Sequence, residues 1–89
     1  MKKKNVKQAL TNVLDIPQEI VLDVPKIVLD SNTSVWIENY KGIIAYDETS
    51  VKINTNQFII TILGQNLSID SMTTEELTIS GSIASLEYQ

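Results

Sequence analysis

The strongest constraint on the fold is a short run of alternating apolar and polar residues that recurs every sixteen residues. The runs begin at Ser34, Ser50 and Asn66, and each places an apolar residue at its second and fourth positions. Successive side chains of a β-strand point to opposite faces, so each run predicts a strand that is buried on one side only. A second alternating run follows each of the three, which makes a pair of strands the repeating unit.

Eight short strands are predicted between Lys26 and Tyr88, with turn-forming residues between them. The face expected in the core consists of Val35, Ile37, Val51, Ile53, Phe58, Ile60, Ile62, Leu67, Ile69, Leu77 and Ile79. The opposite face is polar apart from Trp36, and Gly64 and Gly81 are expected in turns or at a bulge. These features predict an all-β fold, a small antiparallel β-meander in the form of a curled sheet, β-roll or partial barrel. A β-solenoid, in which short strands stack as coils, is the alternative.

The N-terminal segment differs in composition from the rest of the chain. Residues 1–14 contain four of the seven lysines, and apolar residues recur there at three- and four-residue spacing from Val6 to Leu14. This spacing predicts a short amphipathic helix, which Pro17 ends. We therefore expect a basic tail with a short helix over 1–14 and a single β domain over 15–89. The helix docks either on that domain or on a partner, and its lysines suit weak contact with an anionic membrane surface.

Composition argues against most kinds of chemistry. The chain has seven Lys, no Arg and eleven acidic residues, a net charge of −4, which does not suit a nucleic-acid binder. It has no Cys and no His, and these residues supply most nucleophiles, general bases and zinc ligands. The carboxylate pairs Asp47-Glu48 and Glu75-Glu76 lie in predicted turns. We expect a cytoplasmic protein that is not an enzyme and has no cofactor and no metal site.

The candidate functional residues are those of a protein-interaction surface. Trp36, Glu38, Tyr40 and Lys41 surround the first predicted hairpin, with Tyr40 expected in step with Trp36 on the polar face. Half-exposed aromatic residues often anchor protein interfaces. The alternative is that the N-terminal helix or the segment over 17–24 covers Trp36. A second surface is the weakly charged segment from Phe58 to Ile69, which as a poorly guarded strand edge would favour homo-oligomers.

Several segments resemble the YabP/YqfC family of sporulation proteins, more closely its YqfC branch. They are Leu14-Asp-Ile-Pro-Gln-Glu-Ile20, Leu22-Asp-Val-Pro-Lys-Ile27, Ile37-Glu-Asn-Tyr-Lys-Gly-Ile-Ile-Ala-Tyr46, Val51-Lys-Ile-Asn-Thr55, Ile62-Leu-Gly-Gln-Asn-Leu-Ser-Ile69 and Glu75-Glu-Leu-Thr-Ile-Ser-Gly81. The resemblance covers roughly residues 14 to 87. Its strength comes from many matching segments in the same order, because no single motif is diagnostic.

The resemblance implies a protein made in the mother cell of a spore-forming bacterium and used in spore-envelope assembly, of cortex or coat. It implies no enzymatic activity. The implied partner is an integral membrane sporulation protein encoded nearby, so the protein would be cytoplasmic in the mother cell and peripheral at the outer forespore membrane. The alternative function is a self-assembling scaffold or coat-associated protein.

Overall fold

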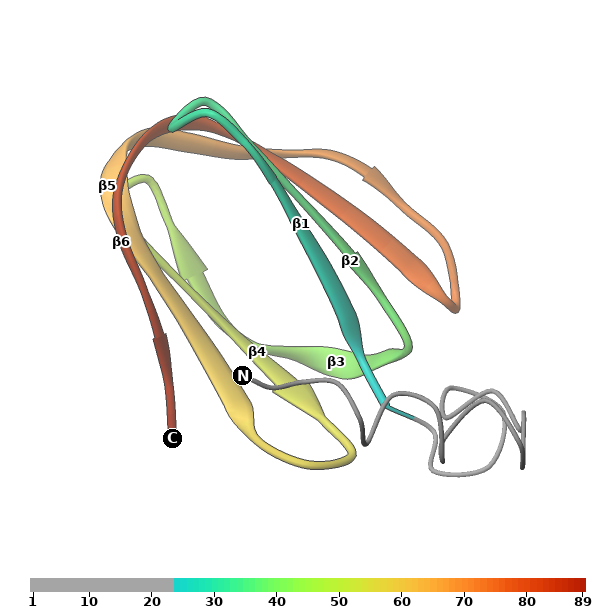
Figure 1. Cartoon of the computed structure of the whole chain (residues 1–89). Coiled ribbons are helices and arrows are strands. Elements are labelled where there is room, and N and C mark those ends of the chain that lie inside the picture. Colours follow the sequence, from blue (N-terminus) through green and yellow to red (C-terminus); the bar gives the residue numbers. More distant parts are fainter. Residues whose placement is uncertain (1–23) are drawn as a thin grey trace, which may run out of the picture.

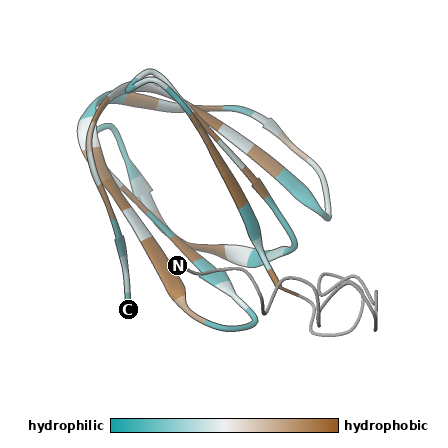
Figure 2. Cartoon of the chain, in the orientation of Figure 1, coloured by the Kyte–Doolittle hydropathy of each residue, from teal (hydrophilic) through white to brown (hydrophobic). Residues whose placement is uncertain are grey.

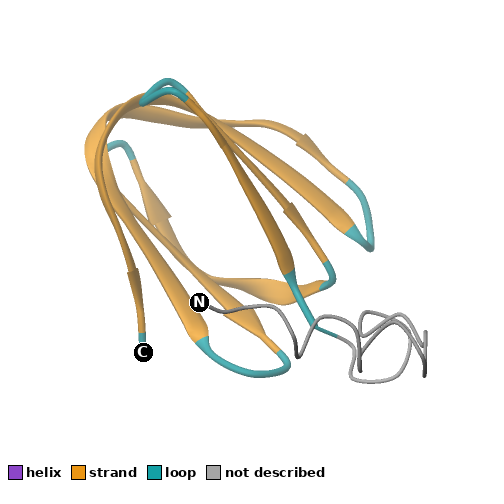
Figure 3. Cartoon of the chain, viewed as in Figure 1, coloured by secondary structure: helices purple, strands orange, loops and turns teal. Residues whose placement is uncertain are grey.

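A computed structural model describes residues 24–89, which form one six-stranded antiparallel sheet (Figures 1 and 3). The strands are β1 (Lys26–Asp30), β2 (Ser34–Glu38), β3 (Tyr40–Asp47), β4 (Ser50–Thr55), β5 (Ile59–Met72) and β6 (Glu76–Tyr88). Their order in the sheet is β1-β2-β6-β5-β4-β3, and the sheet is not closed. The predicted N-terminal helix lies outside the described residues.

The sheet curls into two layers because β5 and β6 are long and bend together (Figure 1). The first layer contains β1, β2, the first half of β6 and the second half of β5. The second layer contains β3, β4, the first half of β5 and the second half of β6. The prediction of an antiparallel curled sheet is confirmed. The β-solenoid is excluded, because every pair of neighbouring strands is antiparallel.

The bend lies at Gly64 and Gly81, where the pairing of β5 with β6 is irregular. A side chain at Gly64 would place its Cβ 2.1 Å from the Ser82 carbonyl oxygen, and Gly81 has a φ of 142°, so both positions require glycine. Both glycines also donate backbone hydrogen bonds to the turns of neighbouring hairpins. The Gly64 amide donates to the Thr49 carbonyl of the β3–β4 turn at 3.0 Å, and the Gly81 amide donates to the Thr33 carbonyl of the β1–β2 turn at 3.1 Å. The prediction of turns at these glycines was wrong, whereas the alternative, a bulge, agrees with the irregular pairing. The glycines bend two continuous strands, so eight predicted strands become six.

A single residue, Asn39, carries the chain from β2 in the first layer to β3 in the second. Asn39 has a φ of 67°, a left-handed conformation that asparagine adopts more readily than most residues. Its amide donates to the Glu75 carbonyl at 2.8 Å, and its Nδ2 donates to the Val24 carbonyl at 3.1 Å. The connection departs from a simple meander, because it joins strands at positions far apart in the sheet.

The core lies between the two layers and has the composition that alternation predicts. The residues buried there are Val35, Ile37, Tyr40, Val51, Ile53, Ile60, Ile62, Leu67, Leu77, Ile79 and Ile83. Figure 2 shows the hydropathy alternating along the strands that contribute them. Of the predicted core residues, Phe58 and Ile69 are partly buried and pack against this cluster. The facing prediction is therefore confirmed for every strand that supplies a fully buried residue.

The weakly charged segment from Phe58 to Ile69, expected to be a poorly guarded strand edge, lies inside the sheet in its first half and at an edge in its second half. The segment Ile59–Leu63 pairs with β4 on one side and with β6 on the other, so the expectation of an edge was wrong there, whereas Ser68 and Ile69 pair with β6 alone among the described strands. The strands at the two ends of the sheet are β1 and β3. Pairing of β3 with β4 is interrupted by two irregularities, whereas all five residues of β1 pair with β2 in regular register.

Candidate protein-interaction surface

The outer face of the first layer carries two short rows of side chains, and Trp36 is at the middle of one of them. One row is Val28, Trp36 and Thr78, and the other is Lys26, Glu38 and Glu76, each read across β1, β2 and β6. These six residues are called the Trp36 strip. The strip faces away from the core because the intervening residues of β2, Val35 and Ile37, are fully buried. The alternation along this strand predicts Trp36 on the outer face, and the structure agrees.

Trp36 is half-buried and contacts side chains of both neighbouring strands. Its Nε1 donates to Oε1 of Glu76 at 3.5 Å, and Val28, which lies beside it on β1, is 45% exposed. A half-exposed aromatic side chain beside an exposed apolar residue is typical of interface anchors. The strip is thus a suitable protein-binding surface.

The charges of the strip are not balanced within the sheet. Glu38 lies directly opposite Glu76 on β6, with Lys26 opposite Glu38 on the other side. Like charges directly opposite each other in an antiparallel pair destabilise it. Two carboxylates against one amine leave the strip acidic, so it suits a basic partner.

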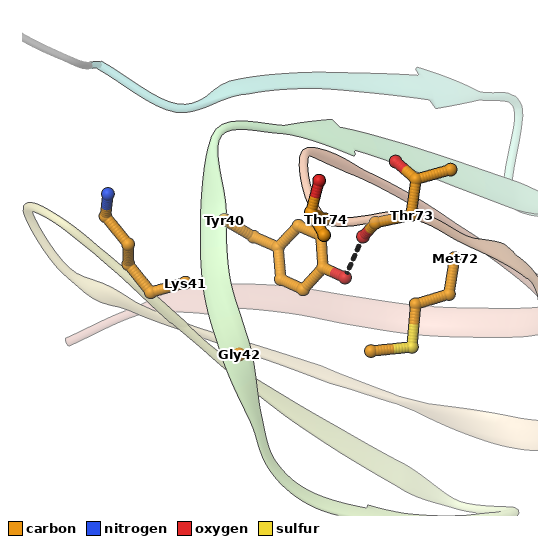
Figure 4. Close-up of a pocket in the computed structure, with 6 residues that line it drawn as sticks. All are labelled: Tyr40, Lys41, Gly42, Met72, Thr73 and Thr74. Atoms are coloured by element: carbon orange, nitrogen blue, oxygen red, sulfur yellow. Dashed lines mark hydrogen bonds between the residues drawn. The ribbon is translucent and has the colours of Figure 1, made fainter.

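Tyr40 does not share this face, contrary to the sequence-based expectation. It is only 6% exposed, and its hydroxyl donates to the Thr73 carbonyl in the β5–β6 loop (Figure 4). The alternation that would put Tyr40 in step with Trp36 is broken at Asn39, where the chain changes layer. Tyr40 is a core residue that links β3 to the β5–β6 loop, and Tyr46, whose hydroxyl lies 3.4 Å from the Leu67 carbonyl, links β3 to the second half of β5.

Lys41 is exposed and lies at a shallow hollow beside the β5–β6 loop. The hollow is lined by Tyr40, Lys41, Gly42, Met72, Thr73 and Thr74. Figure 4 shows the Lys41 side chain on the opposite side of β3 from the Tyr40 ring. Met72 is 55% exposed, which makes the hollow partly apolar. The structure therefore separates the four predicted residues: Trp36 and Glu38 lie together, Tyr40 lies in the core and Lys41 lies on β3.

The carboxylate pairs lie in exposed positions next to turns, as predicted. Oδ1 of Asp47 accepts hydrogen bonds from the Thr49 amide at 2.8 Å, the Thr49 hydroxyl at 2.9 Å and the Ser50 amide at 3.0 Å. The Thr49 amide lowers the pKa of Asp47 most, and the Thr49 hydroxyl and Ser50 amide lower it further. Asp47 thus orders the β3–β4 turn. Within residues 24–89, no group of three or more acidic side chains is placed to hold a metal ion.

Comparison with known proteins identifies the family. The sequence profile of the YabP family matches residues 22–89, which includes every strand of the sheet. The chain belongs to the YabP family. It is also 30% identical over 87 residues to a protein named Uncharacterized protein YqfC from Bacillus subtilis (strain 168), covering 98% of this chain and 94% of that relative. The resemblance noted from the sequence is confirmed.

Four of the six residues of the Trp36 strip in this YabP-family chain were not predicted from the sequence. Lys26, Val28, Glu76 and Thr78 were not singled out. Glu76 and Thr78 join the strip through pairing between β2 and β6, which are about forty residues apart, and Lys26 and Val28 join it through pairing between β1 and β2. Only the turn at Asp30 signalled that Val28 would lie opposite Trp36. Within the described part of this YabP-family chain, no helix is long and apolar enough to cross a membrane.

Proposed function

We propose that this YabP-family chain is a non-enzymatic interaction module that helps to assemble the spore envelope, cortex or coat. It would act in the mother-cell cytoplasm, peripherally at the outer forespore membrane, by docking its Trp36 strip on an integral membrane sporulation protein encoded nearby. The sporulation role is supported by the resemblance of the quoted segments to the YabP/YqfC family. The absence of Cys and His from the sequence supports a role in binding rather than in catalysis.

The observation that carries the docking proposal is the position of Trp36. Its indole lies on the outer face of the sheet, with Nε1 3.5 Å from Oε1 of Glu76 and the exposed side chain of Val28 beside it. Tryptophan is among the residues that contribute most to binding energy at protein interfaces. Burying this side chain and Val28 against a partner would remove apolar surface from water at no cost to the core.

Charge favours a membrane protein as that partner. From residue 8 onwards the chain has three lysines against eleven acidic residues, and the strip itself is acidic. Cytoplasmic loops of membrane proteins carry an excess of Lys and Arg. Such a loop would complement Glu38 and Glu76 and relieve their mutual repulsion.

The test is co-purification of the tagged full-length protein from sporulating cells, with membranes solubilised in mild detergent and the recovered proteins identified by mass spectrometry. Three forms are compared: the wild type, Trp36→Ala, and Tyr88→Ala as the matched control. Tyr88 is an exposed aromatic residue, 58% accessible, in the second layer and outside the strip. Circular dichroism checks that both variants fold.

We expect one integral membrane protein to be recovered with the wild type and with Tyr88→Ala, at near-equal amounts, and to be lost with folded Trp36→Ala. Equal recovery with both variants would refute docking through the strip. Recovery of the protein alone, in large assemblies, would refute the membrane partner and favour the self-assembling scaffold.

A further inference from the structure

We propose that two copies of this chain associate through β1, whose free edges pair antiparallel about Val28 to form one continuous sheet. The first observation is the position of β1 at the end of the sheet, where β2 is its one neighbour among the described strands. An edge strand presents unpaired amide and carbonyl groups that another strand can bond. β1 is also regular, since each residue from Lys26 to Asp30 pairs with one residue of β2.

The sequence of β1 is complementary to itself. Read antiparallel against a second copy, Lys-Ile-Val-Leu-Asp places Lys26 opposite Asp30, Ile27 opposite Leu29 and Val28 opposite Val28. The two ends thus form opposite-charge pairs, and the three positions between them form apolar pairs. Cross-strand pairs of both kinds stabilise antiparallel sheets. Two-fold symmetry generates every pair twice, apart from the central Val28 pair.

The apolar side chains of β1 are exposed where this pairing would cover them. Val28 is 45% exposed and Leu29 is 52% exposed, although Leu29 lies opposite the fully buried Val35. Pairing of two β1 strands would continue both faces of the sheet across the dimer. On the inner face, Leu29 would gain the partner's Ile27 as a neighbour. On the outer face, the two Val28 side chains would meet between the two Trp36 residues.

The other edges are less suited to self-pairing. β3 has two register irregularities, which interrupt a regular edge. The second half of β5 is linked to β3 by the Tyr46 hydroxyl, which lies 3.4 Å from the Leu67 carbonyl, and the loop that follows β5 is linked to β3 by the Tyr40 hydroxyl. The second half of β6, read against itself about Ser85, would place the apolar Ile83 opposite the charged Glu87. β1 is therefore the edge of the described sheet with matched charge and apolar pattern.

The predicted dimer is weak, because a five-residue strand pair buries less surface than a stable complex usually does. We expect the mass of the purified full-length chain to rise towards twice that of the monomer between about 10 µM and 1 mM. Raising the salt concentration should shift this transition to higher protein concentration, since exposed ion pairs are screened. The dimer is inferred from β1 alone and goes beyond the proposed docking function. Measurements on the purified protein test the dimer and not the docking.

Charge reversal tests the antiparallel register directly. Lys26→Asp gives a strand with Asp at both ends, and Asp30→Lys gives one with Lys at both ends, so each variant repels its own copy. Each should associate at least about tenfold more weakly than the wild type. Mixed in equal amounts, the two variants are complementary at both ends and should form heterodimers. The double variant, with both residues exchanged, should regain wild-type association.

Sedimentation velocity of the full-length proteins measures each mass, and circular dichroism checks folding. Lys52→Asp is the matched control, because it makes the same charge change on the outer face of β4, away from β1, and should leave association unchanged. In the double variant, as in the single Lys26→Asp variant, the new carboxylate faces Glu38 of the same chain. Both variants therefore carry the same destabilisation within one chain, and a difference in their association reports on the pairing between chains. A wild type that stays monomeric to about 1 mM, single variants that dimerise like the wild type, or a mixture that forms no heterodimer would each overturn the proposal.

Discussion

Gly64 is the position at which one added methyl group should destabilise the fold most. In Gly64→Ala the new Cβ would lie 2.1 Å from the Ser82 carbonyl oxygen and 3.1 Å from the Ile83 Cα, whereas ordinary contacts are 3.4–4 Å. Both atoms belong to the backbone of β6, so neither can rotate away. β5 and β6 would have to separate by about 1.3 Å at the bend that holds both layers together.

The expected loss of stability is about 3–4 kcal/mol. Overpacking a rigid site costs about 1–3 kcal/mol, and the upper end applies because backbone is displaced. Weakening the bond from the Gly64 amide to the Thr49 carbonyl, 3.0 Å long, adds about 1 kcal/mol. A domain of this size has a free energy of unfolding of about 5–13 kcal/mol. The variant should therefore fold with a melting temperature lowered by roughly 12–30 °C, or not fold.

Urea and thermal unfolding followed by circular dichroism measure the effect, with Gly42→Ala as the control. Gly42 also lies in a strand, but a Cβ there would meet no atom within 4 Å. Gly42→Ala should stay within about 0.5 kcal/mol of the wild type, or stabilise it by up to about 1 kcal/mol. If Gly64→Ala were as stable as Gly42→Ala, the close approach of β5 and β6 at the bend would be refuted.

Three further substitutions test separate contacts by the same unfolding measurements. Tyr40→Phe should cost about 1 kcal/mol by removing a buried hydroxyl bond, whereas Tyr46→Phe, half-exposed with a 3.4 Å contact, should cost less than about 0.5 kcal/mol. Thr61→Val should stabilise the protein by about 0.5–1 kcal/mol, because the buried Thr61 hydroxyl has no hydrogen-bond partner among the described residues. The pKa of Asp47 is lowered in the folded protein, so its carboxylate contributes to the free energy of unfolding above pH 3.8, the value for an unperturbed Asp. This contribution is lost as the pH falls through the folded pKa, and Asp47→Asn should therefore flatten the acid part of the plot of stability against pH.

Each of these has an outcome that contradicts its reasoning. Equal losses for Tyr40→Phe and Tyr46→Phe would mean that burial of the hydroxyl does not matter. Destabilisation in Thr61→Val would show that the hydroxyl has a partner. An unchanged acid limb in Asp47→Asn would remove Asp47 as the source of that pH dependence.

Alternation predicted the core well because burial in a sheet follows a period of two. Val35 and Ile37, like Val51 and Ile53, are fully buried, as their spacing requires. Strand ends were less predictable, since glycine serves a turn and a bend equally. The contacts that distinguish the two roles at Gly64 come from Ser82 and Ile83, which no local pattern relates to it.

The candidate surface could be predicted only in part, for a similar reason. Trp36 and Glu38 share a face because they lie two residues apart in one strand. Tyr40 continues that spacing but lies beyond Asn39, whose positive φ takes the chain into the other layer. Glu76 comes to Trp36 through pairing across some forty residues. Short-range patterns therefore found the anchor of the Trp36 strip and missed its surroundings.

The central place of β6 has a consequence for how the protein is made. β6 follows every other described strand in the chain, yet β2 and β5 both pair with it. During synthesis, the β1–β2 hairpin lacks its neighbour until about forty more residues have left the ribosome. Until then β2 is paired on one side only, and its other edge is open to other chains in a crowded cell. Folding of this domain is therefore expected to follow translation of β6, and a nascent chain stalled before Glu76 should be a substrate for chaperones.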